Sequence, residues 1–384
     1  MKHSIISKVV YTPTKIKGET TINIVGDTIE SIGSKNDDGY NIIDLRGYTI
    51  IPGLVDIHIH GINGYDTMDG DLRSIEEMSK YIAALGVTSF LATTVTATLD
   101  KVAATLKNIR DCLKQELSGS RLLGTYVEGP YISDEFKGAH PSQFIREISI
   151  DELKRLVDVA GEALVVVTIA PEKTDAINAI EYLTSKNVRV SLGHTNATFL
   201  QAKSAFDAGA SIVTHLFNGM RGLNHREPGI VGAALTDDRA KVELICDLVH
   251  LAPPIMQIAQ KCKGDANLIL ISDCIEAAGL IDGQYRLGEL DVFVENGISR
   301  LKDGTLAGST LKLLDAVKNM SLHAKIPFED VLSMATINPA RAIGKDDIVG
   351  SLETGKKADI VALNDLCEPV FVMVGGKIVV DKTK

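Results

Sequence analysis

The chain has 384 residues and a net charge of −10, with 45% hydrophobic and 23% charged residues. This length is sufficient for one large core or for a barrel with a smaller second domain. Nucleic acids and acidic membrane surfaces bind basic protein surfaces, so the acidic balance argues against either of them as the main partner.

Residues 1–52 contain short runs in which polar and apolar residues alternate, separated by turns with Gly and Asp, as in "TINIVGDTIESIG" (21–33). This pattern is typical of antiparallel strands. The same pattern returns in residues 345–384. Because neither end is long enough to bury a core alone, we expect the two ends to pair into one small β-sandwich domain.

Residues 53–344 repeat another pattern, in which a short β-branched run is followed by a turn and a stretch with helical periodicity. Eight such runs are found, at 53–60, 87–95, 122–129, 164–171, 188–195, 211–218, 241–247 and 268–273. Helical stretches between them span 71–86, 99–117, 149–161, 174–187, 197–209 and 253–264. This alternation predicts parallel strands with crossover helices, and eight strands predict an α/β fold of the (β/α)8 TIM barrel type.

Two further segments follow the eighth run. Residues 274–309 are too long for a plain loop and predict a hairpin insertion over the mouth of the barrel. Residues 310–325 and 328–344 show helical periodicity. We therefore expect the barrel domain to extend to residue 344.

Side chains that bind metals end several of the predicted strands. His58 and His60 are two residues apart in "DIHIHG" (56–61), so their side chains point to the same face of the strand. The other ligand-type residues at strand ends are Glu128, His194, His215 and Asp273. Barrel enzymes carry their chemistry at the carboxyl ends of the strands, and these side chains would meet there.

Such a cluster needs a counter-charge. Unpaired imidazoles and carboxylates in an apolar interior cost several kcal/mol per group, and a divalent cation removes that cost. Because no cysteine converges on the cluster, Zn²⁺ or Fe²⁺ is favoured over a thiolate site, with Mn²⁺ or Co²⁺ as alternatives. Such a cation lowers the pKa of bound water toward ~7 and supplies hydroxide for hydrolysis. Asp273 could take a proton from that water and return it to a leaving nitrogen.

Longer motifs carry a family resemblance. They are "YVEGPYIS" (126–133), "KGAHP" (137–141), "LGHTNAT" (192–198), "THLFNGM" (214–220), "REPGIVGAA" (226–234), "ICDLVH" (245–250), "ISD" (271–273) and "DGTLAGST" (303–310). With the paired histidines of the first strand, they resemble the amidohydrolase superfamily, and more narrowly the N-acetylglucosamine-6-phosphate deacetylase family. The resemblance implies hydrolysis of N-acetylglucosamine 6-phosphate to glucosamine 6-phosphate and acetate by metal-bound hydroxide.

The resemblance also implies roles for individual residues. Glu128, His194 and His215 would hold the main metal, and Asp273 would act first as general base and then as general acid. His140 would polarise the acetyl carbonyl. The expected substrate contacts are Ala139, His140, Asn218, Gly219, His225, Arg226, His250, Leu306, Ala307 and Gly308.

The metal count and the oligomer follow from the same resemblance. Some members of the deacetylase family lack one or both histidines of the first strand and work with one metal, so the presence of both favours two metals per subunit, bridged through Glu128. Many binuclear amidohydrolases use a lysine at the end of the fourth strand, but here that strand ends in "TIAPE" (168–172) and Lys173 is expected to face solvent. Arg226 and His225 would bind phosphate in a loop near the interface of a homodimer.

Alternative functions stay open at this point. Nothing in the sequence distinguishes the glucosamine substrate from its galactosamine epimer. A cyclic-amide hydrolase or a deaminase of the same superfamily is a second alternative, disfavoured by the missing lysine and by the loop suited to phosphate. A catalytically inactive relative that only binds a partner is a third, disfavoured because every ligand position is filled.

The location of the protein is predicted from its cysteines and its apolar runs. Five cysteines are widely spaced without a CxxC pair, as is typical of free thiols in a reducing cytoplasm. The longest apolar runs, such as 163–167, are far shorter than the roughly 20 residues of a membrane helix. The first residues carry scattered charges instead of the apolar core of a secretion signal. We therefore expect a cytoplasmic protein.

Overall fold

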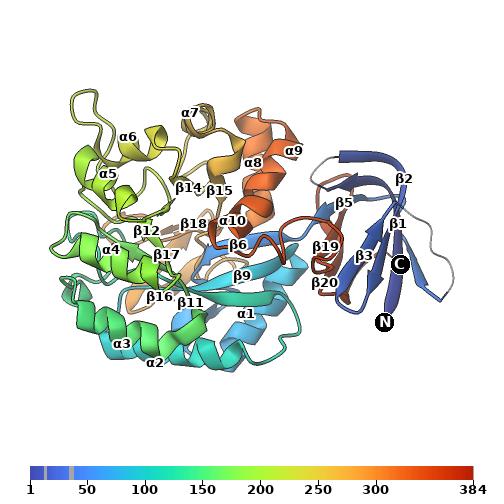
Figure 1. Cartoon of the computed structure of the whole chain (residues 1–384), viewed down its shortest axis with the longest axis horizontal. Coiled ribbons are helices and arrows are strands. Elements are labelled where there is room, and N and C mark those ends of the chain that lie inside the picture. Colours follow the sequence, from blue (N-terminus) through green and yellow to red (C-terminus); the bar gives the residue numbers. More distant parts are fainter. Residues whose placement is uncertain (13–14, 34–38, 384) are drawn as a thin grey trace.

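A barrel forms the larger part of the molecule (Figure 1). The computed structural model describes residues 1–12, 15–33 and 39–383. The parallel strands of the barrel follow in the order β6 (Leu54–Ile59), β9 (Val87–Thr94), β10 (Arg121–Val127), β11 (Leu164–Ile169), β12 (Arg189–Leu192), β13 (Ile212–Val213), β14 (Lys241–Leu244) and β15 (Leu268–Leu270). These runs are almost wholly buried because helices cover their outer face and side chains fill the inside of the barrel.

The chain beyond β15 closes the barrel against β6. Asp273 N donates a hydrogen bond to His58 O at 2.9 Å, and His60 N donates to Cys274 O at 2.9 Å. The predicted TIM barrel is therefore confirmed, and this closure brings the ends of the first and last strands together.

Helices cover the barrel in the expected positions. One crossover helix follows each of the first seven strands: α1 (Leu72–Ala84), α2 (Leu99–Cys112), α3 (Ile150–Ala160), α4 (Ala176–Ser185), α5 (Phe199–Asp207), α6 (Gly229–Thr236) and α7 (Pro253–Lys263). After β15 come α8 (Leu313–His323), α9 (Phe328–Met334) and α10 (Ile337–Ala342). Short elements are η1 (Thr67–Asp69), η2 (Ser142–Phe144), η3 (Gly161–Ala163), η4 (Asp265–Asn267), β7 (Gly61–Ile62) and β8 (Tyr65–Asp66). Within the described ranges, no helix combines the length and the apolar composition needed to cross a membrane.

Helix α6 was not predicted from the sequence. Its residues from Gly229 to Leu235 are all buried, so the segment has no polar face. Helical periodicity is visible only where a polar stripe alternates with an apolar one. The motif "REPGIVGAA" therefore shows no helical periodicity, although it contains a helix that is covered on all sides, including by α5 and α7.

The small domain is one sheet built from both ends of the chain (Figure 1). Its strands are β1 (Lys2–Tyr11), β2 (Lys15–Val25), β3 (Thr28–Ile32), β4 (Asn41–Asp44), β5 (Thr49–Pro52), β19 (Ile360–Leu363), β20 (Pro369–Val374) and β21 (Lys377–Asp381). β5 joins the two halves by pairing with β1 and with β19. Against expectation, β4 and β5 run parallel to β1, where they lie one after the other, β4 beside residues 3–6 and β5 beside residues 9–10. The domain bounds at residues 52 and 345 stay a prediction.

The predicted insertion after the eighth strand is a three-stranded antiparallel sheet, one strand more than a hairpin. Its strands are β16 (Gly283–Leu287), β17 (Leu290–Glu295) and β18 (Ile298–Arg300). Segment 301–309 then returns to the barrel, where Ser309 N donates a hydrogen bond to Asp273 O at 2.8 Å. The insertion is thereby anchored to the end of the last barrel strand.

A partly buried ion pair joins the small domain to the barrel. Arg121 on β10 donates to both carboxylate oxygens of Asp359, from Nη1 at 2.6 Å and from Nη2 at 3.2 Å. Asp359 also accepts a hydrogen bond from Gly375 N at 2.8 Å. Removing one partner of such a pair leaves the other charge uncompensated. This contact therefore stabilises the position of the small domain on the barrel.

Asp359→Ala should lower the free energy of unfolding by about 2 kcal/mol, since Arg121 and Gly375 N lose their acceptor together. Urea denaturation followed by circular dichroism measures the change. Lys377→Ala is a matched control, because Lys377 and Glu116 form an ion pair across the same junction with side chains that are 66% and 76% exposed. The control should cost less than ~0.5 kcal/mol, and equal effects of the two variants would contradict this assignment.

Candidate active site

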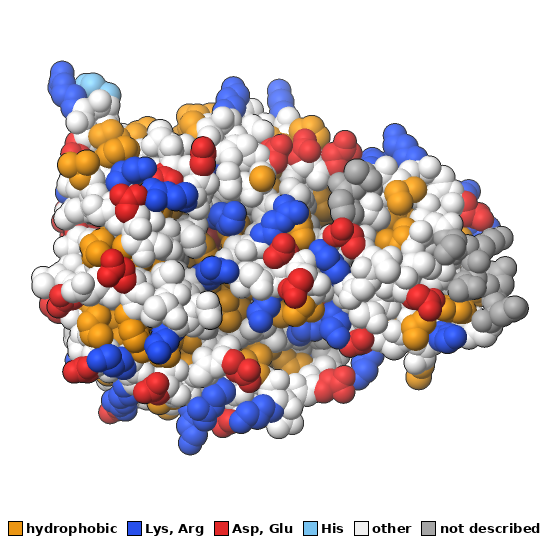
Figure 2. All heavy atoms as spheres, in the orientation of Figure 1, with side chains coloured by type: hydrophobic (Ala, Val, Ile, Leu, Met, Phe, Trp, Pro, Cys, Tyr) orange, Lys and Arg blue, Asp and Glu red, His pale blue; other side chains and the backbone are white. Residues whose placement is uncertain are grey.

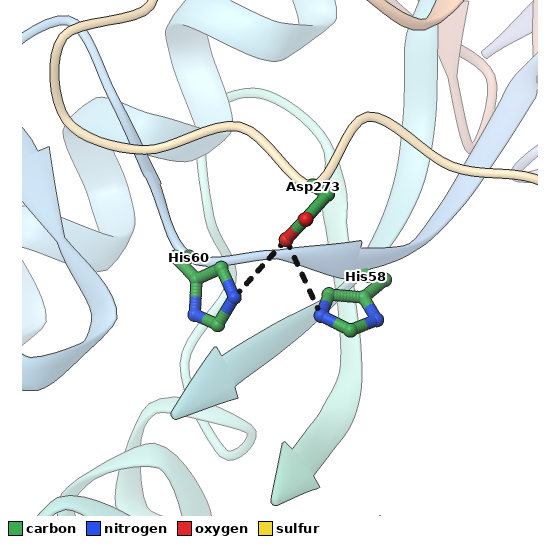
Figure 3. A group of neighbouring side chains, drawn as sticks. All are labelled: His58, His60 and Asp273. Atoms are coloured by element: carbon green, nitrogen blue, oxygen red, sulfur yellow. Dashed lines mark ion pairs between the residues drawn. The ribbon is translucent and has the colours of Figure 1, made fainter. Parts of the chain in front are cut away.

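His58, His60 and Asp273 form the first cluster of metal-type ligands, shown in Figure 3. The two histidines point from one face of β6, as their spacing predicted, and Asp273 approaches from the segment after β15. Asp273 Oδ1 lies 3.2 Å from His60 Nε2 and 3.5 Å from His58 Nε2. All three side chains are buried.

Glu128, His194 and His215 form a second buried cluster beside the first. Glu128 Oε1 lies 3.1 Å from Nε2 of His194 and 3.1 Å from Nε2 of His215. Its other oxygen, Oε2, lies 3.2 Å from His60 Nε2. The structure therefore brings all six predicted ligands together, and Glu128 touches both clusters.

The carboxylates of these clusters attract positive charge. Burial alone would raise the pKa of Glu128, but the charges of His58 and His194 hold it well below its usual range. Burial likewise opposes protonation of His60, yet its hydrogen bonds to Asp273 and Glu128 raise its pKa to about 9. The centre thus favours a positive charge that protons on the histidines, or a divalent cation, can supply.

The imidazoles are oriented to bind a cation. Nδ1 of His194 donates to Phe136 O at 2.9 Å, and Nδ1 of His215 donates to Asn218 O at 3.1 Å. In the neutral rings both Nε2 lone pairs therefore face inward, where the two atoms are 3.1 Å apart. Two lone pairs at this distance repel unless a cation lies beside them. Nε2 of His58 is also buried without a hydrogen-bond partner, so the donor set fits divalent metal ions.

Three of the ligand residues have unusual backbone geometry. φ is +46° at His194, +26° at His215 and +50° at Asp273. Residues other than glycine rarely adopt this left-handed region, and they do so mainly where function requires it. Each of the three residues follows the end of a strand, β12, β13 or β15, at the rim that was predicted to carry the chemistry.

His140 is held as a neutral hydrogen-bond donor. Thr96 N donates to His140 Nδ1 at 3.3 Å, and the Thr96 hydroxyl lies 2.7 Å from the same atom. Nδ1 therefore accepts, and the ring proton sits on Nε2, which lies 3.5 Å from Glu128 Oε2. Burial and the neighbouring His194 lower the pKa of His140 to about 4. At neutral pH this ring can donate to a carbonyl oxygen beside the clusters.

A cavity of about 300 Å³ opens over the two clusters. Its lining includes the predicted contact residues Ala139, His140, Asn218, Gly219, His250, Leu306 and Gly308. Gly219 has φ +56°, and a Cβ there would lie 2.9 Å from Nδ1 of His194. A glycine is thus required where this loop passes the metal ligand.

Three predicted contact residues do not line this cavity. Ala307 is fully buried and packs into the core. His225 and Arg226 are exposed on segment 221–228, which projects from the barrel before α6 (Figure 1). The tip of this projection carries basic and histidine side chains in Figure 2.

Lys173 corrects one expectation from the sequence. Its side chain is only 10% exposed, and Nζ pairs with Glu147 at 2.8 Å. It was expected to face solvent, but residues 170–176 fold into a turn that holds the side chain against the protein. Lys173 pairs with Glu147 and is not among the described residues that line the cavity over the two clusters.

Residues that the sequence did not single out also shape the site. The additional lining residues are Gly138, Phe217, Ile245, Leu287 and Thr305. Thr96, Asp247 and Glu243 contact Nδ1 of His140, His250 and His58, respectively. Thr96, Asp247 and Glu243 are polar residues in, or shortly after, an apolar barrel strand, and this position was the only sign of their role in the sequence. Thr305 lies in the motif "DGTLAGST" (303–310), whereas Leu287 is in none of the motifs and reaches the cavity only through the fold of the insertion.

The comparison with known proteins agrees with this geometry. Residues 49–379 match the amidohydrolase family. The chain belongs to the amidohydrolase family. This amidohydrolase is 42% identical over 339 residues to the N-acetylglucosamine-6-phosphate deacetylase of Vibrio furnissii, covering 88% of this chain and 85% of the relative. It is 44% identical over 315 residues to the N-acetylgalactosamine-6-phosphate deacetylase of Escherichia coli O157:H7, covering 82% and 83% of the two chains.

A solved structure matches this amidohydrolase over 99% of both chains. It is a mutant N-acetyl-D-glucosamine-6-phosphate deacetylase from Mycobacterium smegmatis in complex with N-acetyl-D-glucosamine-6-phosphate, with a TM-score of 0.93 and 33% identity. The resemblance predicted from the motifs is confirmed, and the chain is that of a metal-dependent hydrolase.

Proposed function

We propose that this amidohydrolase removes the acetyl group from N-acetylglucosamine 6-phosphate, giving glucosamine 6-phosphate and acetate. The observation that carries the proposal is one small cavity bordered by both ligand clusters and by His140. Its volume, about 300 Å³, suits a monosaccharide more than a polymer or a peptide. The similarity to the deacetylases of Vibrio furnissii and Mycobacterium smegmatis supports the choice of substrate.

The catalytic roles follow from the positions of the side chains. A divalent cation at these ligands lowers the pKa of water and polarises a carbonyl group. His140 Nε2 donates a hydrogen bond to the acetyl oxygen. Asp273 takes a proton from the attacking water as the C–O bond forms, and gives it to the sugar nitrogen as the C–N bond breaks. Acetate and the free amine leave with all atoms balanced.

His250 and the segment 305–308 provide the sugar contacts in this proposal. Burial opposes ionisation of Asp247, but the hydrogen bond from His250 holds the pKa of Asp247 below its usual value. Asp247 Oδ2 lies 2.7 Å from His250 Nδ1. This contact fixes the orientation of the imidazole ring and leaves Nε2 available to the substrate. Leu306 and Gly308 present the backbone of the insertion to the cavity.

Acetate release from N-acetylglucosamine 6-phosphate, with elemental analysis of the same sample, tests the proposal. We expect turnover together with about two metals per chain, Zn²⁺ or Fe²⁺ being favoured by the His and carboxylate donors. Release of ammonia from a nucleobase with no acetate from the phosphosugar would refute it.

The galactosamine epimer is the second candidate, since the Escherichia coli O157:H7 relative is as similar as the glucosamine deacetylases. The ratio of kcat/KM for the two N-acetylated phosphosugars decides between them. A ratio above ~10 in favour of the glucosamine sugar, equivalent to about 1.4 kcal/mol, would support the first proposal.

The metal count is proposed to be two, because each cluster offers three ligands of its own. His58→Gln combined with His60→Asn should lower the count from about two to about one, since the Glu128 cluster keeps its ligands. Elemental analysis after dialysis measures it. If the double variant loses all metal, or if the parent holds only one, the two clusters are not separate sites.

A second copy of the chain is proposed to complete the phosphate site. Among the described residues, those that line the cavity include no Lys or Arg, although the phosphate is anionic. Arg226 and His225 are exposed on the projecting segment, and Leu223 beside them is 58% exposed. In a homodimer this segment can reach the cavity of the partner and pair its guanidinium with the phosphate.

Arg226→Ala should raise KM about tenfold or more with little change in kcat, because a charge-assisted contact to the phosphate is lost in all bound states. Arg155→Ala, which removes another exposed arginine, is the control and should leave both constants unchanged. At a substrate concentration well below the KM of Arg226→Ala, mixing it with Asp273→Asn should restore about a quarter of the sites, since each mixed dimer then holds one intact pair. Absence of complementation would place Arg226 outside the partner's site.

A cytoplasmic location belongs to the same proposal. All five cysteines are free, with Cys112, Cys246 and Cys274 buried. Free thiols are typical of a reducing compartment.

A further inference from the structure

Glu243 is a buried carboxylate that the proposed mechanism does not use. It lies on β14 between Val242 and Leu244, and its exposed fraction is 0%. Side chains alternate along a strand, so Glu243 faces the opposite way from its two apolar neighbours. Its Oε2 lies 3.1 Å from His58 Nδ1 and accepts a hydrogen bond from His215 N at 3.3 Å. Its Oε1 has no hydrogen-bond partner.

This carboxylate fixes the protonation pattern of His58. An ionised carboxylate only accepts hydrogen bonds, so Nδ1 of His58 donates to Glu243, and in the neutral ring that can bind a cation Nε2 keeps its lone pair. That lone pair faces Asp273 Oδ1 at 3.5 Å, within the first cluster. The ring of Tyr126 packs against the imidazole with the centroids 4.5 Å apart. The ring of His58 is therefore held in its metal-binding orientation from two sides.

The other histidines of the clusters lack such a partner. His194 and His215 donate from Nδ1 to backbone carbonyls, and Nδ1 of His60 has no hydrogen-bond partner. A full negative charge stabilises the positive charge that an imidazole shares with a bound cation more than a carbonyl dipole does. His58 should therefore bind a cation more strongly than the other histidines do. This stabilisation is confined to a cation in the first cluster.

We propose that Glu243 is a positioning residue that controls occupancy of the metal site formed by His58, His60 and Asp273. It acts through the tautomer and donor strength of His58, and it leaves the site of Glu128, His194 and His215 able to bind on its own. Its contact with the backbone of His215 keeps the two sites at a fixed separation. The inference rests on the proposed metal-dependent function but concerns binding alone.

Two variants of Glu243 test the proposal by metal binding, without any need for turnover. Glu243→Leu removes the acceptor, so His58 can move its proton to Nε2 and the metal count should fall from about two to about one. Glu243→Gln keeps an acceptor oxygen but not the charge, and should weaken only the second Co²⁺ to bind by about 10- to 100-fold. Chelator competition gives the affinities, and the Co²⁺ absorption spectrum shows which site fills.

Ser191→Ala is the matched control. It deletes a buried hydrogen bond to Thr214, 2.7 Å long, from the same barrel interior, and leaves both contacts of His58 in place. It should keep both metals at the affinity of the parent. Circular dichroism identifies a variant that does not fold, and Glu243→Gln then decides alone.

The outcomes separate this inference from the proposed reaction. Loss of one metal in Glu243→Leu, with weakened binding in Glu243→Gln, supports it. Two metals at parental affinity in both variants, equal weakening of both sites, or the same loss in Ser191→Ala would overturn it. A parent that holds two metals but releases no acetate would refute the proposed function and leave the role of Glu243 standing.

Discussion

Asp273→Asn is expected to lower kcat for acetate release by about 10³-fold, because proton transfer by a positioned carboxylate contributes roughly 10²- to 10⁴-fold. Asp273 lies between the ligand histidines and the cavity, with Oδ1 3.2 Å from His60 Nε2. An asparagine keeps an oxygen at this position but cannot accept the proton of water. Metal should remain, since Glu128, His194 and His215 do not depend on Asp273.

Single-turnover acetate release and elemental analysis of the same preparation measure the two expectations. Glu276→Gln is a suitable control, because Glu276 is a partly buried carboxylate three residues further along that accepts a hydrogen bond from Arg286 N and does not line the cavity. The control should keep kcat within about twofold. Near-normal kcat in Asp273→Asn would refute the assigned proton transfer.

Glu128→Gln is expected to remove metal from both clusters and to abolish turnover. Five histidine nitrogens surround its two oxygens. They belong to His194 and His215 at 3.1 Å, His60 at 3.2 Å, His140 at 3.5 Å and His58 at 3.6 Å. The substitution removes the shared negative charge and places an amide N–H₂ group among the nitrogen lone pairs. Both effects oppose a cation at either cluster.

The count of metals distinguishes this variant from the double variant of the first strand. Glu128→Gln should hold less than ~0.2 metal per chain after dialysis, and kcat should fall by more than about 10³-fold. His58→Gln with His60→Asn should keep about one metal. If Glu128→Gln retained two metals, the histidines alone would define the sites and Glu128 would not bridge them.

Much of the architecture was readable from local patterns. Six of the crossover helices were found because burial on one face produces a period in the sequence, and the eight strands were found because burial on both faces produces short, nearly continuous apolar runs. The same logic failed for α6, whose residues are buried all round. Local patterns also failed to predict the parallel pairing of β4 and β5 with β1. The direction of a strand depends on the route of the segment that leads to it and not on its composition.

The ligands were predictable for a related reason. His58 and His60 interrupt an apolar strand with a spacing of two, and the other ligands end strands that must meet at one rim of a barrel. The position of Arg226 is not fixed by spacing in the same way, since it lies on an exposed segment outside the strands and does not line the cavity of its own chain.

The sequence by itself determined the fold class, the family and the six ligand-type residues, because these depend on residue identity and on regular spacing. Only the tertiary structure decided which side chains orient the histidines of the site by contacting Nδ1 of their rings. Glu243, Thr96 and Asp247 act on histidines that are 185, 44 and 3 residues away, respectively. Glu243 and His58 meet inside the barrel, and Thr96 and His140 meet between the segments that follow β9 and β10. No local period in a sequence encodes which residues face each other there.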